Sequence, residues 1–297
     1  MSDFQPIGLK HKVFFEEALT WENSRSSTDS FGNVFLWNIL CKRNAARLGE
    51  RLGVEYLCPK GAFYAYPSGR GDLAAAIDAL EERAAEHGLP LSLHGVTEPQ
   101  REALEQALPG EFTFTEDRDD ADYVYSTEAF ATLAGKKLHG KRNFCNRFES
   151  TYDWHYEPLT PAGFDDCRTL LGAWDEEKDG GDAEENEAIR RMMQYWDTLD
   201  MTGGILYADG KPVAFTAGEV LCADTMDVHF EKALDSVPGA YPMIAREFAR
   251  HIQKDYPEIL YLNREEDMGK PGLRKAKEEW YPMFMISKYT ALRKEKL

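Results

Sequence analysis

The clearest pattern of hydrophobic and polar positions lies in the second half of the chain. Residues 204–217 have the pattern of two strands joined at Asp209-Gly210, a residue pair typical of tight β-hairpins. In residues 225–233 polar and apolar positions alternate, which predicts a strand. Further patterns predict a helix at 240–253, a strand at 258–262, a helix at 272–280 and a strand at 283–290.

The first half shows a similar series. We expect a hairpin at 54–66, a helix at 72–87, a strand at 90–94, a helix at 97–107 and a strand at 111–125. Helical patterns near 161–174 and 184–199 precede the second hairpin. The recurrence of helix, strand, helix and strand indicates a duplicated α/β unit.

Length and cysteine content narrow the class of protein. The 297 residues allow one large domain or two smaller ones. No stretch approaches the roughly 20 apolar residues of a membrane span, and the first residues lack a secretion signal. The five cysteines are scattered without a Cys-x-x-Cys pair. This argues against a disulfide framework and a cysteine zinc site, and we expect a cytoplasmic protein.

The charge is strongly negative but uneven. A net charge of −17 argues against a protein that coats nucleic acid or an anionic membrane through its whole surface, and we expect no DNA partner. Residues 175–187 hold eight carboxylates and one lysine, a pattern typical of a solvated surface, and they lack the ligand spacing of a calcium-binding EF-hand. In contrast, residues 136–147 carry five Lys or Arg and no acid.

The segment 263–277 combines several kinds of chemistry. The apolar run 259–262 ends at Asn263, Arg264 and three acids, and a Gly-Lys-Pro-Gly turn then leads into a helix. Polar side chains at the end of a buried strand are a common place for ligand chemistry in α/β proteins. The start of a helix also attracts anions, and Lys270 and Arg274 add positive charge there.

Two further segments are candidates. If residues from Lys141 onward are helical, Asn143 and Arg147 share one edge and Phe144 and Phe148 another. The result is either an exposed basic helix or an arm that holds anions.

The predicted strand at 225–233 places Thr225, Asp227, His229 and Glu231 on one face. That face is either a solvent-facing polar stripe or a cleft wall with acid–base groups, of which His229 titrates nearest neutral pH.

The familiar catalytic motifs are absent from the sequence. It contains no Gly-x-Ser-x-Gly elbow, no Walker phosphate loop, no His-Glu-x-x-His and no Rossmann glycine fingerprint after a strand. The histidines are dispersed. We therefore expect no metal and no nicotinamide cofactor.

Segments 263–277 and 141–148, together with 229–233, resemble the phosphatidylglycerol lysyltransferase C-terminal-like family. That family is similar to the Fem-type aminoacyltransferases and is built from tandem GNAT-like domains. The resemblance implies an α/β (α+β) fold of two such domains with mixed, mostly antiparallel sheets. We expect a degenerate domain at 1–135 and a domain at 136–297 that holds the basic arm and the active site.

The resemblance also implies the activity: transfer of an acyl or aminoacyl group from a carrier to an amine or hydroxyl. We expect no tightly bound cofactor, with acyl-CoA or aminoacyl-tRNA as co-substrate and a small molecule or peptide as acceptor. The GNAT pyrophosphate loop corresponds to 234–240, where Gly239 is retained but an initial Arg or Gln is missing and Pro238 removes one backbone donor.

Roles follow as hypotheses for these residues. Glu265 or Asp267 would accept the acceptor's proton, and Asn263 would orient substrate or donate to the oxyanion. His229 and Glu231 are further acid–base candidates. The residues expected to hold the carrier are Lys141, Arg142, Asn143, Arg147, Gly239, Lys270 and Arg274. The alternative function is a catalytically silent module that senses a nucleotide-bearing or acidic small molecule.

Overall fold

The protein divides into two compact units. The structure, a computed structural model, describes residues 3–59, 61–178 and 180–294. Unit 1 contains the chain up to Asp122, Glu266–Arg274 and the segment from Met285 onward. Unit 2 contains Tyr123–Glu265 and Lys275–Phe284. The units therefore differ from the contiguous domains 1–135 and 136–297 that we expected, because strands β7 (Phe112–Ser126) and β13 (Phe284–Arg293) each contribute residues to both.

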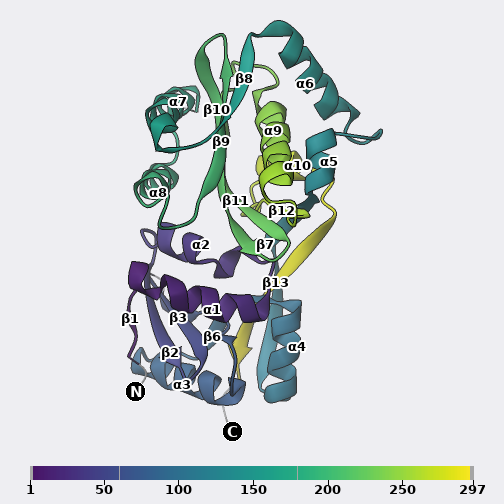
Figure 1. Ribbon diagram of the computed structural model, residues 1–297. Helices are drawn as coiled ribbons and strands as arrows, with labels where there is room; N and C mark the ends of the chain where they lie inside the picture. The colour runs from purple at the N-terminus through teal and green to yellow at the C-terminus, as the bar shows by residue number, and fades with distance from the viewer. Residues whose placement is uncertain (1–2, 60, 179, 295–297) are drawn as a thin grey trace. The chain divides into compact units, whose positions relative to one another are not determined.

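Unit 1 is a sheet with helices packed on it (Figure 1). Its strands follow the order β1-β2-β3-β4-β6-β13-β7, and β5 pairs with β3. Leu73, Ile77 and Leu80 form one buried stripe of α3 and belong to the core cluster of this unit. The elements that precede β7 are β1 (Gln5–Pro6), α1 (Lys12–Glu22), α2 (Phe31–Leu36), β2 (Lys42–Leu48), β3 (Arg51–Cys58), β4 (Gly61–Tyr64), β5 (Ser68–Gly69), α3 (Leu73–Glu86), β6 (Ser92–Thr97) and α4 (Glu98–Ala107).

Unit 2 has strands in the order β7-β12-β11-β10-β9-β8. Helices α7 and α8 lie on one side of β9 and β10, and α9 lies on the other (Figure 1). Its elements are α5 (Thr127–Thr132), α6 (His139–Thr151), β8 (Trp154–Pro158), α7 (Phe164–Glu177), α8 (Ala183–Gln194), β9 (Thr202–Ala208), β10 (Lys211–Cys222), β11 (Thr225–Ala233), α9 (Ala240–Asp255), β12 (Tyr261–Asn263) and the end of α10 (Pro271–Glu278).

The central strand of the candidate site is held by its neighbours in register. Strand β11 pairs antiparallel with β10, which places Glu219 opposite Asp227. It pairs parallel with β12, which places Asn263 opposite Asp227. The polar face of β11 is therefore flanked by β10 on one side and by the end of β12 on the other.

Most of the predicted elements are present. Strand 225–233 is confirmed with both its ends, and helices 72–87, 97–107 and 240–253 correspond to α3, α4 and α9. The hairpin turn at Asp209-Gly210 has positive φ at both residues, as a two-residue turn of the I′ type requires. The predicted strand 258–262 is shorter and later, at 261–263, and helix 161–174 begins only at Phe164.

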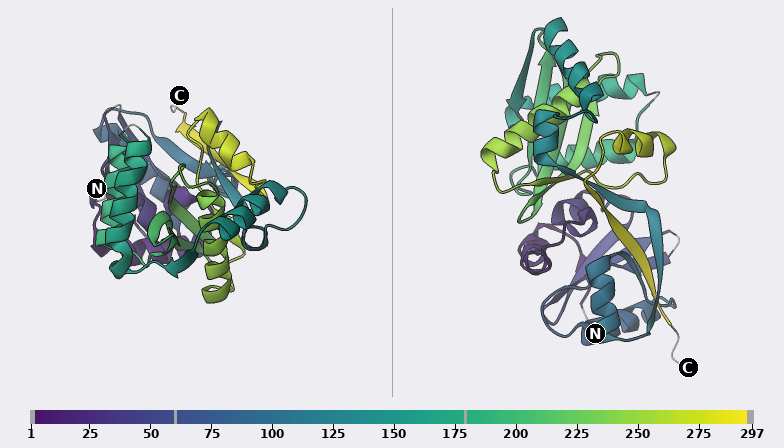
Figure 2. Two further views of the ribbon diagram at one scale, coloured as in Figure 1. Left: turned by 90° about the horizontal axis from the view of Figure 1, so that it is seen from above. Right: turned by 90° about the vertical axis from the view of Figure 1, so that its right-hand side faces the viewer.

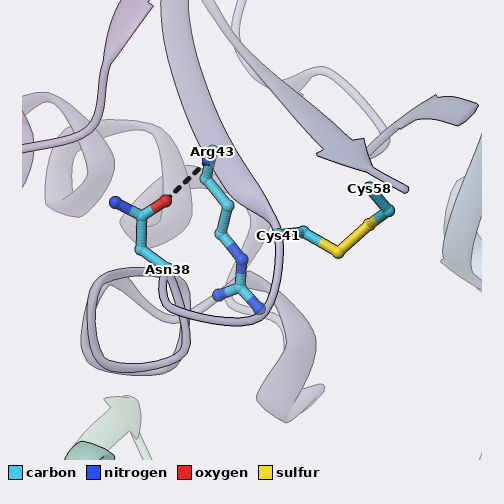
Figure 3. The surroundings of a disulfide bond; sticks show 4 residues. All are labelled: Asn38, Cys41, Arg43 and Cys58. Carbon is cyan, nitrogen blue, oxygen red and sulfur yellow. Dashed lines mark hydrogen bonds between the residues drawn. A yellow bond between two sulfur atoms is a disulfide. The ribbon is translucent and has the colours of Figure 1, made fainter.

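The sequence argued against a disulfide framework, but the structure contains a disulfide between Cys41 and Cys58 (Figure 3). The cause is the register of the β2–β3 hairpin, in which Lys42 pairs with Leu57 and Cys41 therefore faces Cys58. Beside the bridge, the backbone N–H of Arg43 donates to Asn38 Oδ1 at 2.6 Å. Of the other cysteines, Cys145 and Cys167 are buried and Cys222 is partly exposed.

The described chain begins and ends in unit 1 (Figure 2). Among the described residues, no helix has both the length and the apolar character needed to cross a membrane.

Candidate functional site

The polar stripe of β11 is the centre of the candidate site, and it is buried rather than exposed to solvent. Asp227 is completely buried, and His229 is 6% exposed. The side chain of Glu231 is 10% exposed. Because apolar β11 residues point to the opposite face, the alternation of the sequence has produced a strand with a buried polar side. Buried charged groups are costly unless they are paired, so their partners matter.

His229 lies among three carboxylates. Its Nδ1 is 3.1 Å from Glu265 Oε1 and 3.7 Å from Asp227 Oδ2. Its Nε2 is 3.1 Å from Glu219 Oε1. These carboxylates come from three different segments: β10, β11 itself and the turn after β12. The pairing of the strands thus brings residues that are far apart in the sequence into one cluster.

This arrangement sets the protonation of His229. Burial lowers the pKa of the imidazole, but the charge of Asp227 and the hydrogen bonds to Glu219 and Glu265 outweigh it, so the pKa lies well above its ordinary value. With both nitrogens facing carboxylates, the ring is an imidazolium that donates to Glu219 and Glu265. His229 is therefore not free to take a proton at neutral pH. This differs from the role of a neutral-pH base, which the sequence had left open.

The same cluster has the donor atoms of a metal site. One atom from each of Asp227, His229 and Glu265 lies within 4.8 Å of the others. A metal ion there would need the Nδ1 lone pair. In the protonated ring this position carries a proton directed at the carboxylates, so a metal ion would have to displace that proton.

Glu265 is the member of the cluster that is most open to solvent. Its side chain is 18% exposed, compared with 11% for Glu219 and none for His229 and Asp227. Its backbone N–H donates to Asn263 Oδ1 at 2.7 Å. Asn263 itself is completely buried. It therefore shapes the turn that carries Glu265 and has no surface with which to orient substrate, which corrects its predicted role.

Glu231 is held in a second polar group beside the first. It accepts from Arg264 Nη2 at 2.6 Å. Burial raises the pKa of Glu231, an effect that the positive charges of Arg264, Lys277 and Lys141 oppose. The guanidinium of Arg264 is also surrounded by aromatic rings, whose centroids lie between 5.6 and 5.9 Å from it: Tyr125, Phe130 and Trp280. Glu231 is thus the partner of a fixed arginine.

Asp267 has a structural role in unit 1. It is completely buried. It accepts from Arg274 Nε at 2.8 Å and Nη2 at 2.7 Å, and from Arg118 Nη1 at 3.2 Å. The backbone N–H of Gly269 also donates to it at 2.9 Å. A carboxylate engaged by two guanidinium groups is a poor base, so the predicted catalytic role of Asp267 is withdrawn.

Arg274 and Lys270 also belong to unit 1. Arg274 donates to Asp119 at 2.6 Å as well as to Asp267, and these hydrogen bonds raise its pKa. Its guanidinium is therefore committed to carboxylates of the protein and is not free to hold carrier phosphates. Lys270 is exposed at the start of α10, and its backbone N–H donates to the Asp267 carbonyl at 2.9 Å.

The basic arm is a helix, α6, as expected. Lys141 contacts the residues that follow α10: its ammonium lies 3.5 Å from Glu279 and 5.0 Å from the centre of the Trp280 ring. Arg142 donates to the carbonyls of Leu133 and Gly135, so it ties α6 to the preceding loop instead of holding a carrier.

The outer side of α6 is open. Arg147 and Asn143 are exposed, and the Asn143 amide lies 3.4 Å from His139 Nδ1. The two phenylalanines differ: Phe148 is fully buried, whereas Phe144 is 50% exposed. Lys137 lies 5.4 Å from the ring centre of Tyr281, which is 49% exposed. This part of unit 2 therefore carries both exposed cations and partly exposed aromatic rings.

Gly239 has a conformational role before α9. Its φ is +94°, and a Cβ at this position would lie 2.9 Å from the Phe144 carbonyl oxygen. In the same loop, the backbone N–H groups of Asp235 and Ser236 donate to the carboxylate of Glu177 at 2.8 and 3.3 Å. The protein's own carboxylate therefore occupies donors that a bound pyrophosphate would need.

Sequence reasoning missed Glu219 and Arg264 as members of the site. The second strand of the predicted hairpin ended at residue 217, whereas β10 continues to Cys222 and includes Glu219. The register between β10 and β11 then brings Glu219 to His229. Arg264 stood within the highlighted segment 263–277, between Asn263 and Glu265. A polar residue near the end of an apolar strand was the available signal for both.

Comparisons with known proteins agree with this architecture. The model of a family described as phosphatidylglycerol lysyltransferase, C-terminal, matches residues 22–292. A crystal structure of a conserved protein of unknown function from Bacteroides thetaiotaomicron VPI-5482 is 38% identical, with a TM-score of 0.91 over 99% of this chain and 100% of that one. Among the curated proteins no match was found.

Two more distant structures share the fold. The structure of L-PGS from Bacillus licheniformis is 16% identical, with a TM-score of 0.68 over 99% of this chain and 94% of that one. A tandem GNAT protein from the clavulanic acid biosynthesis pathway is 12% identical, with a TM-score of 0.53 over the full length of both chains. The predicted GNAT-like α/β fold is thereby confirmed.

Proposed function

The chain belongs to the phosphatidylglycerol lysyltransferase C-terminal family, and from this premise we propose that it transfers an acyl or aminoacyl group from an activated carrier to an amine or hydroxyl acceptor. The observation that carries the proposal is the Glu219–His229–Glu265 cluster of unit 2, whose one partly open end is Glu265. Acyl transfer needs a base for the acceptor's proton, and this cluster offers one.

In the proposed mechanism, Glu265 takes the proton from the acceptor as the acceptor's nitrogen or oxygen attacks the carrier's carbonyl carbon. His229 supports this step from behind Glu265, because its imidazolium fixes the direction of the carboxylate through the 3.1 Å hydrogen bond. Glu219 fixes the other side of the ring. The proton then passes to the leaving oxygen or sulfur of the carrier, directly or through water, which completes the transfer.

We expect two positive charges of unit 2 to stabilise the developing oxyanion. Arg264 is held by Glu231 and the aromatic rings around it, and Lys141 lies over Trp280. Both charges are fixed before any substrate arrives. Preorganised charges of this kind are commonly the largest contribution to catalysis in acyl transfer.

Of the two carriers, we favour aminoacyl-tRNA. The donors of the loop before α9 are occupied by Glu177, which weakens the case for a coenzyme A pyrophosphate there. The open side of α6 and the turn just before it, in contrast, offer the exposed side chains of Arg147, Phe144 and Lys137. Lysine and arginine bind phosphates, and aromatic rings stack with unpaired bases, so this surface fits a single-stranded RNA end.

The experiment compares both carriers in binding and in turnover. The protein is mixed with aminoacyl-tRNA or with acyl-CoA and a panel of amine and hydroxyl acceptors, and the transferred label is measured. We expect transfer from aminoacyl-tRNA. Transfer from acyl-CoA alone would overturn the choice of carrier, and binding without transfer to any acceptor would favour the silent sensing module.

A further inference from the structure

The backbone of Glu265 is held in an uncommon conformation. Its φ is +58°, in the left-handed region that residues other than glycine seldom adopt. Such a conformation costs about 1 kcal/mol or more and persists only when neighbouring groups hold it. Glu265 also carries the carboxylate that faces His229. The groups that hold its backbone therefore decide where that carboxylate points.

Lys277, on the last turn of α10, provides the most distinctive of these groups. Its ammonium donates to the carbonyl of Arg264, and to that of Glu265 at 3.2 Å. One side chain thus holds two consecutive carbonyls. Further support comes from the Tyr123 backbone, which accepts from the Arg264 N–H and donates to the Glu265 carbonyl, and from Asn263 Oδ1.

Lys277 is itself fixed in place. Its ammonium lies 5.7 Å from the ring centre of Tyr123. The carbonyl of the same residue accepts from the Tyr125 hydroxyl at 2.8 Å. Both tyrosines belong to β7, which pairs with β12 and so borders the turn that carries Glu265. Helix α10 is therefore anchored where its lysine can reach the turn.

We infer that Lys277 is a positioning residue: its ammonium holds residues 264–265 in the conformation that directs the Glu265 carboxylate at His229. The contacts of Lys277 are present in the free protein and do not depend on the proposed function. Only the effect of Lys277 on catalysis rests on that function. Lys277 takes no proton in the reaction and acts through Glu265 alone.

The test uses the opposite signs of two effects on the pKa of His229. Removing a positive charge near the imidazolium favours its protonation and raises its pKa. Losing the hydrogen bond to Glu265 lowers it. The groups that face the ring are Asp227 on β11 itself, Glu219 on β10 and Glu265 in the turn after β12. Of these three, Glu265 accepts a hydrogen bond from Lys277 through its backbone carbonyl.

The experiment follows the His229 ring nitrogens by NMR through a pH titration of the free protein. Lys277→Met removes the ammonium and keeps the approximate length of the side chain. Glu265→Gln sets the size of the shift that complete loss of the carboxylate causes. Lys275→Met, an exposed lysine on the same helix, is the matched control. Lys277→Gln keeps a donor without the charge, and it serves if the methionine variant does not fold.

We expect Lys277→Met to lower the pKa of His229 by about one unit, part of the shift in Glu265→Gln, while Lys275→Met leaves it unchanged. Lys277→Gln should recover part of the loss. A pKa that rises in Lys277→Met, or stays the same while only the melting temperature falls, would overturn the inference. The titration needs no substrate, so it gives a result even if no transfer is found.

Discussion

At the scale of single residues, the site is defined by how each charge is paired. Glu231 and Asp267 look alike in the sequence as acids near strand ends, but both are engaged by arginines. Glu265 faces a histidine and keeps 18% of its side chain exposed. Partners, rather than residue types, thus separate a candidate base from structural carboxylates.

The charge of His229 predicts how stability depends on pH. The pKa of His229 in the folded protein lies well above 6.5, its ordinary value. Folding therefore binds a proton when the pH lies between 6.5 and the folded pKa. Below pH 6.5 the contribution of His229 to the free energy of unfolding is at its full value. It is lost as the pH rises through the folded value. Replacing His229 with Gln leaves the buried carboxylates of Asp227 and Glu219 and the partly exposed Glu265 without their cation, which should cost about 3–5 kcal/mol at pH 6.

Urea unfolding of the wild type and His229→Gln at pH 6 and pH 9 checks this. We expect the difference in unfolding free energy to be smaller at pH 9. A difference that grows with pH would show that the ring is neutral in the folded protein.

The Asp267 cluster predicts a change in stability without a change in chemistry. Asp267→Asn keeps the shape but leaves Arg274 and Arg118 without their buried partner, so we expect a loss of about 1–3 kcal/mol in thermal or urea unfolding. Single-turnover transfer below the melting temperature should keep the wild-type rate within a few-fold. A hundredfold loss of transfer in a stable variant would return Asp267 to the mechanism.

At the scale of elements, strand and helix patterns with clear periodicity were predictable and their contacts were not. Strand 225–233 followed from its alternation, but nothing in that alternation showed that its polar face is buried against Glu219 and Glu265. The elements before residue 54 had no distinct pattern, so the β2–β3 hairpin and its disulfide were missed. Register decides such pairs, and register depends on tertiary contacts.

The disulfide gives a test at this scale. Cys41 and Cys58 are 17 residues apart, so closing the loop should stabilise the protein by about 3 kcal/mol. Double replacement by serine should lower the free energy of unfolding by about that amount under oxidising conditions. Peptide mapping without reductant should find the two cysteines linked. An unlinked pair, or equal stability of the variant and the wild type, would contradict this expectation.

At the scale of the whole molecule, a net charge of −17 has to be reconciled with an RNA carrier. Acidic groups elsewhere repel RNA, so binding depends on a local basic surface and weakens with salt. The open side of α6 is the surface that we expect to supply this attraction.

Salt dependence tests the role of this surface. We expect combined replacement of Lys137 and Arg147 by alanine to weaken tRNA binding and to make the slope of log K against log salt shallower by about 2. Matched replacement of Lys211 and Lys254, two exposed lysines of unit 2 outside α6, should leave both quantities unchanged. Equal effects of the two pairs would show that α6 is not the RNA surface.

The most direct test of the account is the single-turnover rate of transfer in Glu265→Gln, because the proposed chemistry depends on that carboxylate. The change keeps the shape of the side chain and removes its ability to take a proton. Glu258→Gln, at an exposed glutamate just before β12, is the control. We predict a loss of about a hundredfold or more in Glu265→Gln at a nearly unchanged melting temperature, with Glu258→Gln at the wild-type rate. Transfer by Glu265→Gln at the wild-type rate would contradict the account.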